Sequence, residues 1–592
     1  MPLKNLVQVS PIISNPPGKN RRSRSWGARA LRTCGHLAES YNTLQVSHRG
    51  TYSVERLQAF QCYCEQTSVT RAVVVCILTP LPALLATLLL DCIPLRSPDD
   101  GWEANYMFWI RFFVSGVVIN IGLTYQVKGM VNQLEISAMK CLGIAVGCLS
   151  VYVLTLMTIA SVWIFPVPFG IILGVGPCLG IYLGVLYFAI GPKTLAANPT
   201  LARELKLQLY VLGVQAILIT IYPAFSALYF EVSPHYRAGL VLLLPFTKLV
   251  MKNIVAWSCS HLEEYVPVVE VFSVEVFNAL YASTCMQALN SEFATVVIVG
   301  LDAVHAVLSF HNLRLETRSI HQQQSALLRG PNQNKNMPGD IVATALVTSL
   351  HLRRFRTQSG KLIRVRSPLK HSMGLHESKQ LDRLATHQRT FTSLEARDFN
   401  QGHVESNTST NESTAASLMS AKLQKKSSGR IGPSELLVKF KKQPSFDSLS
   451  REALQVELVE STLRLLFRCE YIALAEYVEC AVPMLFGIYL SVLRHLPSRY
   501  YYPQTRDMVP GQLKATLTNL CMYVALELAS FVLMHATVRR KVGLSALYQL
   551  AFVLETQATQ LQSRLFVWII FILQFTLQHY GVDFTFRFAW MG

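Results

Sequence analysis

Residues 141–165 read CLGIAVGCLSVYVLTLMTIASVWIF. This run contains no charged side chain, and it is longer than the roughly 20 residues that a helix needs to cross the hydrocarbon core of a bilayer. Apolar runs of similar length recur on both sides of it. The sequence therefore predicts an all-α fold, a polytopic helical membrane protein.

The composition of the whole chain favours the same class. Of its 592 residues, 51% are hydrophobic and 15% are charged. Soluble proteins carry about 25% charged residues, so a soluble globule of this size would lack polar groups to cover its surface. We therefore expect an integral membrane protein whose main partner is the lipid bilayer.

About eleven transmembrane helices are predicted, with a range of 10–12. Eight lie before a long polar segment, at residues 72–95, 106–127, 141–165, 169–190, 207–230, 236–257, 265–287 and 293–310. Three lie after it, at 471–493, 515–537 and 565 to about 580. The expected regions are a basic N-terminal segment (1–70), an eight-helix region (71–311), a central loop (312–455) and a C-terminal membrane region (456–592).

The net charge of +18 is concentrated in two polar segments. Residues 1–70 hold 9 basic and 3 acidic side chains, and residues 312–451 hold 23 and 10. Basic segments that flank spans stay in the cytoplasm, and the eight spans between these two segments return the chain to the same side. The N-terminus and the central loop are therefore predicted to be cytoplasmic, and nucleic acid is not an expected partner.

The central loop is rich in Ser, Thr, Gln, Lys and Arg and is predicted to be largely disordered. Two parts of it, residues 350–370 and 436–446, interleave basic and apolar residues, which favours binding to anionic lipids of the inner leaflet; a solvated run of charges is the open alternative. The candidate lipid-binding residues are Arg353, Arg354, Arg356, Lys361, Arg364 and Arg366. Phosphorylation of Ser367 or Ser445 would release such a segment.

Glycines recur along one face of the fourth predicted span, mostly four residues apart. They are Gly170, Gly174, Gly176, Gly180 and Gly184. Small residues allow close approach of a neighbouring backbone in lipid, so helix packing is the expected role, and a glycine-lined path is the alternative.

Ionisable residues inside the spans are the main candidates for function, because a charge at mid-bilayer costs at least about 2.5 kcal/mol. Lys248 and Lys252 share a helix face, and their depths match those of Glu275 and Glu270 on the next span. A two-rung ladder is predicted, pairing Lys252 with Glu270 and Lys248 with Glu275.

Further polar residues lie at similar depth on later spans: Asp302, His305, Glu476, Glu479 and Glu527. Carboxylates then outnumber the deep cations, and the excess must be protonated, bind a cation or face water. Proton or cation transport, helix locking and ligand sensing all remain open. Near the outer surface, Arg111 lies close to Asp91, and a paired or snorkelled interfacial arginine explains it.

Signatures of enzymes and of metal sites are missing from the sequence. There is no H-E-x-x-H, no phosphate loop, no nucleophile elbow and no potassium-type filter. The 13 cysteines include no C-x-x-C pair and read as small buried hydrophobes. We expect no catalytic residue, no metal and no cofactor, and we predict that the chain is not an enzyme.

Several phrases within the spans resemble a known group of proteins. They are Lys252-Asn253, Phe277-Asn278-Ala279-Leu280-Tyr281 and Met286-Gln287 within Leu249 to Gln287, together with Thr79-Pro80-Leu81-Pro82 and Trp109-Ile110-Arg111. In these the chain resembles uncharacterised multi-pass transmembrane proteins of oomycetes. The resemblance implies an integral membrane protein and nothing about a substrate.

The sequence thus favours a proton- or cation-linked transporter, or a channel-like protein, that uses buried carboxylates to bind a proton, a cation or a small solute. The alternative is a membrane receptor or scaffold. In that case the buried charges only lock helices together, and the basic loop binds lipid or protein.

Overall fold

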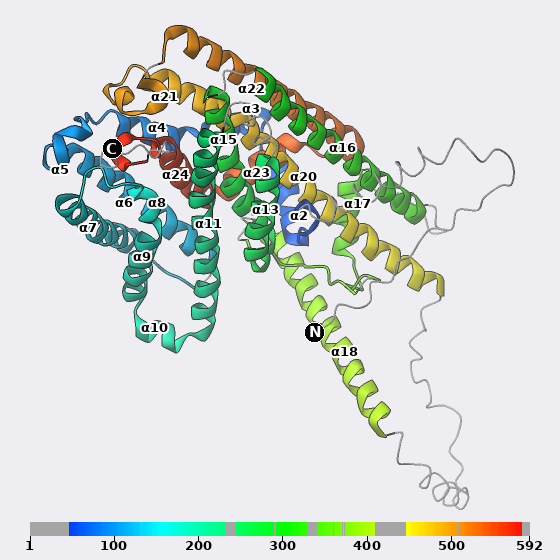
Figure 1. Cartoon of the computed structure of the whole chain (residues 1–592). Coiled ribbons are helices and arrows are strands. Elements are labelled where there is room, and N and C mark those ends of the chain that lie inside the picture. The colour runs from blue at the N-terminus through cyan, green and yellow to red at the C-terminus, as the bar shows by residue number, and fades with distance from the viewer. Residues whose placement is uncertain are drawn as a thin grey trace, which may run out of the picture.

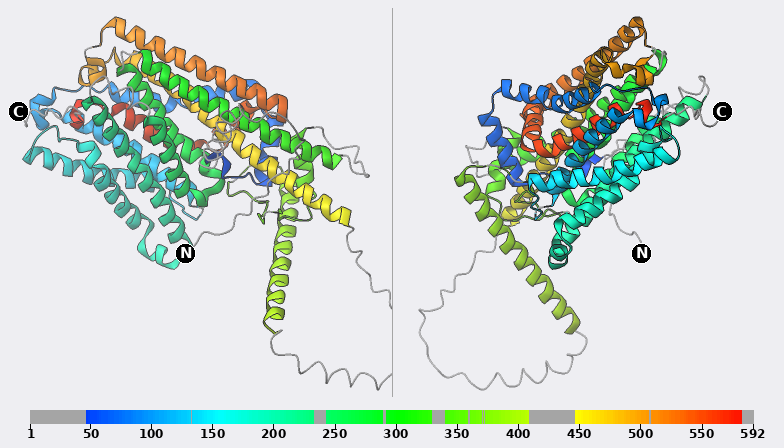
Figure 2. Two further views of the ribbon diagram at one scale, coloured as in Figure 1. Left: turned by 45° about the vertical axis from the view of Figure 1, so that its right-hand side comes forward. Right: turned by 90° about the vertical axis from the view of Figure 1, so that its left-hand side faces the viewer.

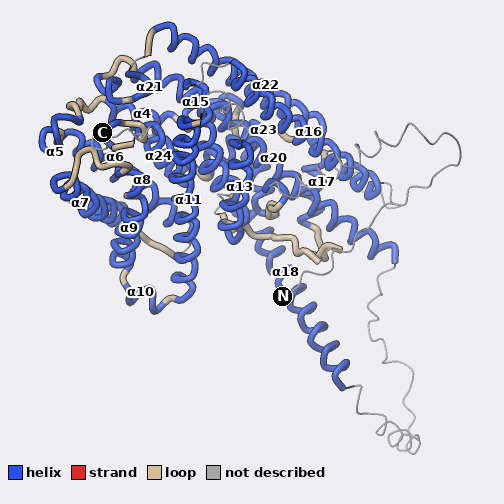
Figure 3. Tube along the Cα trace, in the orientation of Figure 1, coloured by secondary structure: helices blue, strands red, loops and turns tan. Residues whose placement is uncertain are grey.

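The computed structural model of the chain consists of helices joined by short connections (Figures 1 and 3). It describes residues 46–131, 133–232, 243–288, 292–328, 340–358, 360–369, 371, 373–408, 446–506 and 508–582. Within these ranges no strand forms, and the only strand-like contact is a single bridge between Arg356 and Leu362. The all-α prediction is confirmed for the described residues.

Within the described ranges, eight helical segments are long and apolar enough to cross a membrane. They are Val69–Asp91 (α3, Val69–Leu78, and α4, Leu81–Asp91), α6 (Tyr106–Met130), α7 (Ala138–Val162), Gly170–Ile190 (α8, Gly170–Leu173, and α9, Val175–Ile190), Pro199–Ile221 in α11 (Pro199–Glu231), Ser260–Thr284, Arg451–Leu493 in α20 (Phe446–Leu493) and α22 (Pro510–Val542). Each overlaps a predicted span, and the chain is a multi-pass helical membrane protein.

The structure does not confirm the count of about eleven. Helices also occur in the other three predicted spans: α13 (Leu243–Ser258), α16 (Glu292–Leu328) and α24 (Ala558–Gln574), with residues 236–242 of the first of these spans outside the described part. Two of these helices are short, with 16 residues in α13 and 17 in α24. Most residues of α24 are buried, which is typical of a short apolar helix enclosed by others.

Helix α24 lies at the centre of one half of the molecule, against α4 and α6. A glycine permits the close contact with α6, because a Cβ built at Gly122 would lie only 2.9 Å from the Ser563 carbonyl oxygen. Small residues allow such backbone approach where lipid provides no hydrophobic drive for association. Helices α7 and α9 continue the layer outward from α6.

The other half is formed by long helices that run alongside one another, α16, α20 and α22 (Figures 1 and 2). The 48 residues of α20 span about 72 Å at 1.5 Å per residue, more than twice the roughly 30 Å hydrocarbon core. The helix is therefore too long to lie wholly within the hydrocarbon core, and its N-terminal part contacts α2 (Val54–Gln66) and α17 (Ile341–Leu350).

Helices also occur within residues 312–455, which corrects the prediction of disorder for these stretches. Helix α16 continues to Leu328, and α17 (Ile341–Leu350) and α18 (Leu375–Thr408) follow. Helix α18 projects away from the body in all views (Figures 1 and 2). Residues 329–339 and 409–445 lie outside the described part of the chain, and the prediction for Ser445 falls there.

The remaining elements are short. They are η1 (Val46–His48), α2 (Val54–Gln66), η2 (Pro98–Asp100), α5 (Gly101–Ala104), α10 (Pro192–Ala197), η3 (Ser260–Tyr265), α14 (Val266–Glu270), η4 (Val271–Glu275), α15 (Val276–Ala288), η5 (Pro497–Tyr501), α21 (Pro503–Arg506), α23 (Ala546–Thr556) and η6 (Gln578–Tyr580). Among them, η3, α14, η4 and most of α15 make up the segment Ser260–Thr284, and the others lie between the longer helices or at the ends of the described chain. Of these, η4 is a π-helical turn inside a membrane span.

Candidate functional site

The π-helical turn η4 determines how the carboxylates of its span are arranged. Glu270 ends α14 and Glu275 ends η4, five residues later. In a regular α-helix, residues five apart point about 140° away from each other. A π-turn closes its hydrogen bonds between residues five apart, so Glu270 and Glu275 come to lie nearly in line on one face.

Two lysines of α13 face this turn. The Lys248 ammonium lies 2.8 Å from Glu275 Oε2 and donates to Glu479 Oε1 of α20 at 2.7 Å. Lys252 forms an ion pair with the other oxygen of Glu275. Lys248, Lys252, Glu270, Glu275 and Glu479 are called the charge cluster below.

The predicted ladder is confirmed in one rung and wrong in the other. Lys248 pairs with Glu275 as predicted, but Lys252 also pairs with Glu275 and not with Glu270. The prediction assumed a regular helix between the two carboxylates. The π-turn brings Glu275 within reach of both lysines, which depth counted at a constant rise does not capture.

Glu270 occupies a different environment from the other two carboxylates. It is fully buried, and the hydroxyl of Tyr471 on α20 faces it. No hydrogen bond of normal geometry reaches either of its oxygens from the described residues. The Lys252 ammonium lies 5.5 Å from the centre of the Tyr471 ring. Glu270 is therefore near positive charge without a direct ion pair.

The cluster as a whole has more acidic than basic groups. Among the described residues it contains three carboxylates and two ammonium groups, all on α13, the π-turn region and α20. Burying an uncompensated charge costs several kcal/mol. A proton on one of the three carboxyl groups would make these five groups neutral overall.

The other predicted residues lie around this cluster or beyond the described side chains. Glu527 of α22 is buried and lies near Cys480 of α20, which is also close to Glu476 and Glu479. Glu527 is thus a neighbour of the cluster across α20. The side chains of Asp302 and His305 lie outside the described part of the structure.

The predicted glycine face is divided by the structure. A Cβ built at Gly174 would collide with the Tyr152 hydroxyl, and one at Gly170 would contact Val167. A Cβ at Gly176, Gly180 or Gly184 would meet open space among the described residues. A packing role for these last three glycines therefore remains a prediction.

An outer ion pair confirms the expected pairing of Arg111. Arg111 and Asp91 pair with both side chains fully buried, so the arginine does not snorkel. Tyr502 accepts a hydrogen bond from Arg111 at 2.7 Å and donates to Asp91 Oδ1 at 2.7 Å, and Tyr489 donates to Asp91 Oδ2 at 3.0 Å. The network joins α4, α6, α20 and the η5 loop.

A second buried network lies where the N-terminal helix meets α20, and sequence reasoning did not find it. Arg56 Nη2 lies 2.8 Å from both oxygens of Glu470, and Tyr52 donates to the same carboxylate. The Arg56 guanidinium also stacks over the Tyr52 ring, 4.9 Å from its centre. Residues 1–70 have no apolar span, so no sequence signal marked Arg56 as buried.

Part of the predicted lipid-binding segment is docked against this network. Residues 362–369, called the latch, form backbone hydrogen bonds from Val54 N to Arg364 O and from Glu55 N to Val365 O, both 3.0 Å long. Ser367 donates from its hydroxyl to Glu264 and from its amide to Glu55 Oε2.

The docking divides the six predicted lipid-binding residues into two groups. Arg364 pairs with Glu263, and Arg366 pairs with Glu55 and Asp382. Arg353, Arg354, Arg356 and Lys361 are exposed. Arg364 and Arg366 therefore form ion pairs within the protein, and the other four basic side chains are exposed on its surface.

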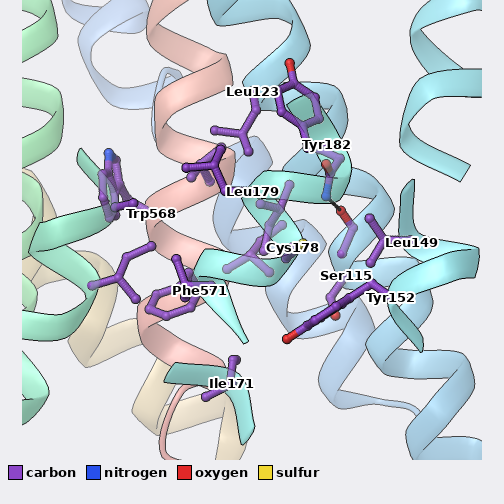
Figure 4. Close-up of a pocket in the computed structure, with 18 of the residues that line it drawn as sticks. Ser115, Leu123, Leu149, Tyr152, Ile171, Cys178, Leu179, Tyr182, Trp568 and Phe571 are labelled. Atoms are coloured by element: carbon purple, nitrogen blue, oxygen red, sulfur yellow. Dashed lines mark hydrogen bonds between the residues drawn. The ribbon is translucent and has the colours of Figure 1, made fainter. Parts of the chain in front are cut away.

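A cavity of about 150 Å³ lies in the other half of the molecule, between α6, α7, α9, α11 and α24 (Figure 4). None of the charge cluster lines it. It reaches the π-turn through Gln215 of α11, which lines the cavity and donates to Ser273 Oγ at 2.8 Å.

No metal-binding group of three or more His, Cys, Asp or Glu side chains occurs among the described residues. Comparison with protein-family models, curated proteins and solved structures gives no match in any of the three. The resemblance to membrane proteins of oomycetes thus remains a prediction from the sequence. The architecture alone classifies the chain, as a multi-pass helical membrane protein with a buried charge cluster at a π-turn.

Proposed function

We propose that this chain is a proton-linked membrane transporter in which Glu270 binds and releases the proton. The observation that carries the proposal is the convergence of three carboxylates on two lysines at a buried π-turn. π-turns within helices occur frequently at functional sites. Carboxylates within spans are common parts of proton relays.

Glu270 is the group best suited to hold the excess proton. Glu275 pairs with both lysines, and Glu479 accepts a hydrogen bond from Lys248. Glu270 faces the Tyr471 hydroxyl, and among the described residues its charged neighbours are Lys252, Glu275 and Lys248, none of them in an ion pair with it. If Lys252 moves from Glu275 toward Glu270, the attraction favours the charged form and releases the proton. The cluster thereby links a side-chain movement to proton exchange.

The orientation proposed from the charge distribution has support in the latch contacts. Because Val54 and Glu55 bond to Arg364 and Val365, the N-terminal helix and the central segment lie on the same side of the membrane. Basic residues favour the cytoplasm, so we propose that this side is cytoplasmic.

Proton flux into vesicles tests the assignment. The full chain is reconstituted with an entrapped pH-sensitive dye, and an inward pH gradient is imposed. We expect Glu270→Gln to abolish flux and Glu270→Asp to retain part of it, since only the second keeps a titratable group. Glu103→Gln, at an exposed outer position, serves as the control. Wild-type flux in a folded Glu270→Gln protein would refute the proposal.

A second candidate is a receptor or scaffold in which the cluster only locks helices. It is favoured by the ion pairing of both lysines and by the absence of cluster residues from the lining of the described cavity. In that case carboxyl substitutions lower the stability without changing any flux, and deletion of the central segment removes the activity. The vesicle experiment, combined with thermal unfolding, separates the two candidates.

The exposed basic side chains also support a lipid partner for the central segment. Arg353, Arg354, Arg356 and Lys361 would each gain about 1 kcal/mol beside an anionic leaflet. We expect anionic nanodiscs, compared with zwitterionic ones, to protect this segment from trypsin. Substituting all four residues by Gln should remove the difference between the two lipids at the remaining tryptic sites.

A further inference from the structure

The cavity between α6, α7, α9, α11 and α24 has a lining without any charged side chain (Figure 4). Most of the lining is apolar or aromatic, including Phe112, Leu149, Leu179, Trp568 and Phe571. Placing an ionic ligand there would require desolvating its charge without a counter-ion. The chemistry of the lining therefore selects a neutral, lipophilic occupant.

Two polar atoms in the lining lack partners. Asn120 is 3% exposed and Gln574 is 2% exposed. The Asn120 side chain donates from Nδ2 to the Gly116 carbonyl at 3.0 Å, but its Oδ1 accepts no hydrogen bond from the described residues. Gln574 Nε2 likewise donates to none of them. Buried polar groups without partners are rare in native proteins.

The two atoms differ in what they require. Asn120 Oδ1 needs a donor, and Gln574 Nε2 needs an acceptor. A hydroxyl group is both a donor and an acceptor. The site is thus suited to a ligand that carries a hydroxyl on an apolar body and not to a pure hydrocarbon.

The size of the cavity limits the ligand further. An apolar cavity of about 150 Å³ is large enough to bind benzene. The cavity here has that volume and is lined by aromatic side chains that suit a flat ring. We propose that it binds a neutral lipophile of phenol or monoterpenoid size. This ligand enters from the bilayer, and its hydroxyl group donates a hydrogen bond to Asn120 Oδ1. This inference does not depend on the proton site.

Thymol and p-cymene provide matched probes, because the two share a carbon skeleton and only thymol has a hydroxyl. The readouts are the melting temperature of the full chain in nanodiscs and the fluorescence of Trp568. We expect saturable binding of thymol, and binding of p-cymene weaker by about tenfold, the worth of one hydrogen bond. Equal binding of the two probes, or no saturable binding of thymol, would overturn the proposal.

Two variants on one helix test the location. Ala216 lines the cavity, and the neighbouring Ile217 is exposed on the lipid side of α11. We expect Ala216→Phe to fill the cavity and abolish thymol binding, and Ile217→Phe to leave it unchanged. Thymol binding that persists in Ala216→Phe would place the probe elsewhere and reject the site.

Asn120→Leu keeps the proposal testable if the cavity-filling variant does not fold. Leu has nearly the same shape as Asn but lacks the acceptor oxygen. We expect this variant to bind thymol and p-cymene equally, with p-cymene no weaker than in the wild type. If Asn120→Leu still prefers thymol by the wild-type factor, the hydroxyl does not meet Asn120 and the proposed binding mode is wrong.

Discussion

Arg111 and Asp91 form an ion pair whose two side chains are fully buried, with two tyrosine hydroxyls completing the carboxylate's hydrogen bonds. Such a pair contributes little net stability compared with apolar residues of the same shape, but the loss of one partner leaves a buried charge. The pair therefore fixes which helices meet at the outer end of the molecule.

Removing one partner of this pair should be costly. We expect Arg111→Met to lower the free energy of unfolding by about 3–5 kcal/mol, measured by denaturant titration in detergent. The double variant Asp91→Asn with Arg111→Met should lose less, because Asn is neutral and still accepts from the tyrosines. A loss under about 1 kcal/mol in the single variant would show that the charge reaches water.

His371 gives the latch region a dependence on pH. Its ring stacks on Phe552, with 5.8 Å between ring centres, and both ring nitrogens are buried without partners among the described residues. Burial, together with the positive charge of Arg56, lowers the pKa of His371 to about 3. The ordinary histidine pKa is about 6.5.

The sign of the effect follows from proton binding. Between pH 6.5 and 3 the unfolded segment binds a proton at His371 and the folded one does not, so stability falls as the pH is lowered. We expect hydrogen exchange of residues 362–371, corrected for intrinsic rates, to speed up between pH 7 and pH 5. His371→Phe retains the stacking and should show a smaller pH effect; an unchanged pH effect would exclude His371 as its source.

At the scale of elements, Ser367 of the latch connects the central segment to α2 and to the end of η3. Ser367 contacts Glu264 and Glu55, so a phosphate or a carboxylate at this position would stand beside two acids. Like charges at this distance repel each other. Ser367 therefore attracts Glu264 and Glu55 through hydrogen bonds, and a negative charge at Ser367 would turn this attraction into repulsion.

Ser367→Glu should release the latch. We expect trypsin to cleave after Arg364 and Arg366 faster in this variant than in the wild type, in proteoliposomes that expose the latch. Ser393→Glu, at an exposed position on α18, controls for added charge. Cleavage at the wild-type rate in Ser367→Glu would mean that the latch is held mainly by its backbone bonds to α2.

The sequence predicted the positions of helices better than it predicted the contacts between side chains. The apolar runs predicted all eight helical segments that, among the described residues, are long enough to cross a membrane. Matching the depths of charged residues predicted the pairing of Lys248 with Glu275. The partner of Lys252 was missed because a π-turn does not change composition or hydropathy. The Arg56 network joins residues more than 400 positions apart, and no local pattern encodes such a contact.

The cavity illustrates a different limit of sequence reasoning. Asn120 and Gln574 are polar residues in predicted spans that are mainly apolar, and no sequence pattern shows that they border a cavity, because a cavity depends on how five helices meet. Periodicity specifies which face of a helix is buried but not how completely the space beside it is filled. The length of α24 was similarly ambiguous, since a short buried helix and a short span have the same composition.

At the scale of the whole molecule, Gln215 connects the cavity to the π-turn that carries Glu270 and Glu275. Trp568 of the cavity lining also contacts Phe277, with 5.5 Å between ring centres. An occupant of the cavity would therefore lie against side chains that contact the π-turn and the start of α15. These contacts offer a physical route between the two proposed sites.

Gln215→Leu tests this connection. We expect thymol to change proton flux in wild-type vesicles and to leave it unchanged in Gln215→Leu, while thymol binding itself persists in the variant. If thymol does not alter the proton flux of the wild type, the two sites act separately. That result would contradict neither the proton site nor the ligand site taken by itself. Loss of binding in Gln215→Leu would instead assign Gln215 to the ligand site.

Helix α20 carries Tyr489 of the outer network, Glu479 and Tyr471 of the cluster region, and Glu470 of the inner network. Pro483 lies between Tyr489 and Glu479 and removes one backbone hydrogen bond from the helix. Below that proline, α20 is a stiff rod, so a tilt or twist that displaces Glu479 carries Glu470 with it. Strain that enters α20 from the end carrying Tyr489 must pass Pro483 before it reaches Glu479, whereas strain that enters from the latch meets no proline on its way to the carboxylates.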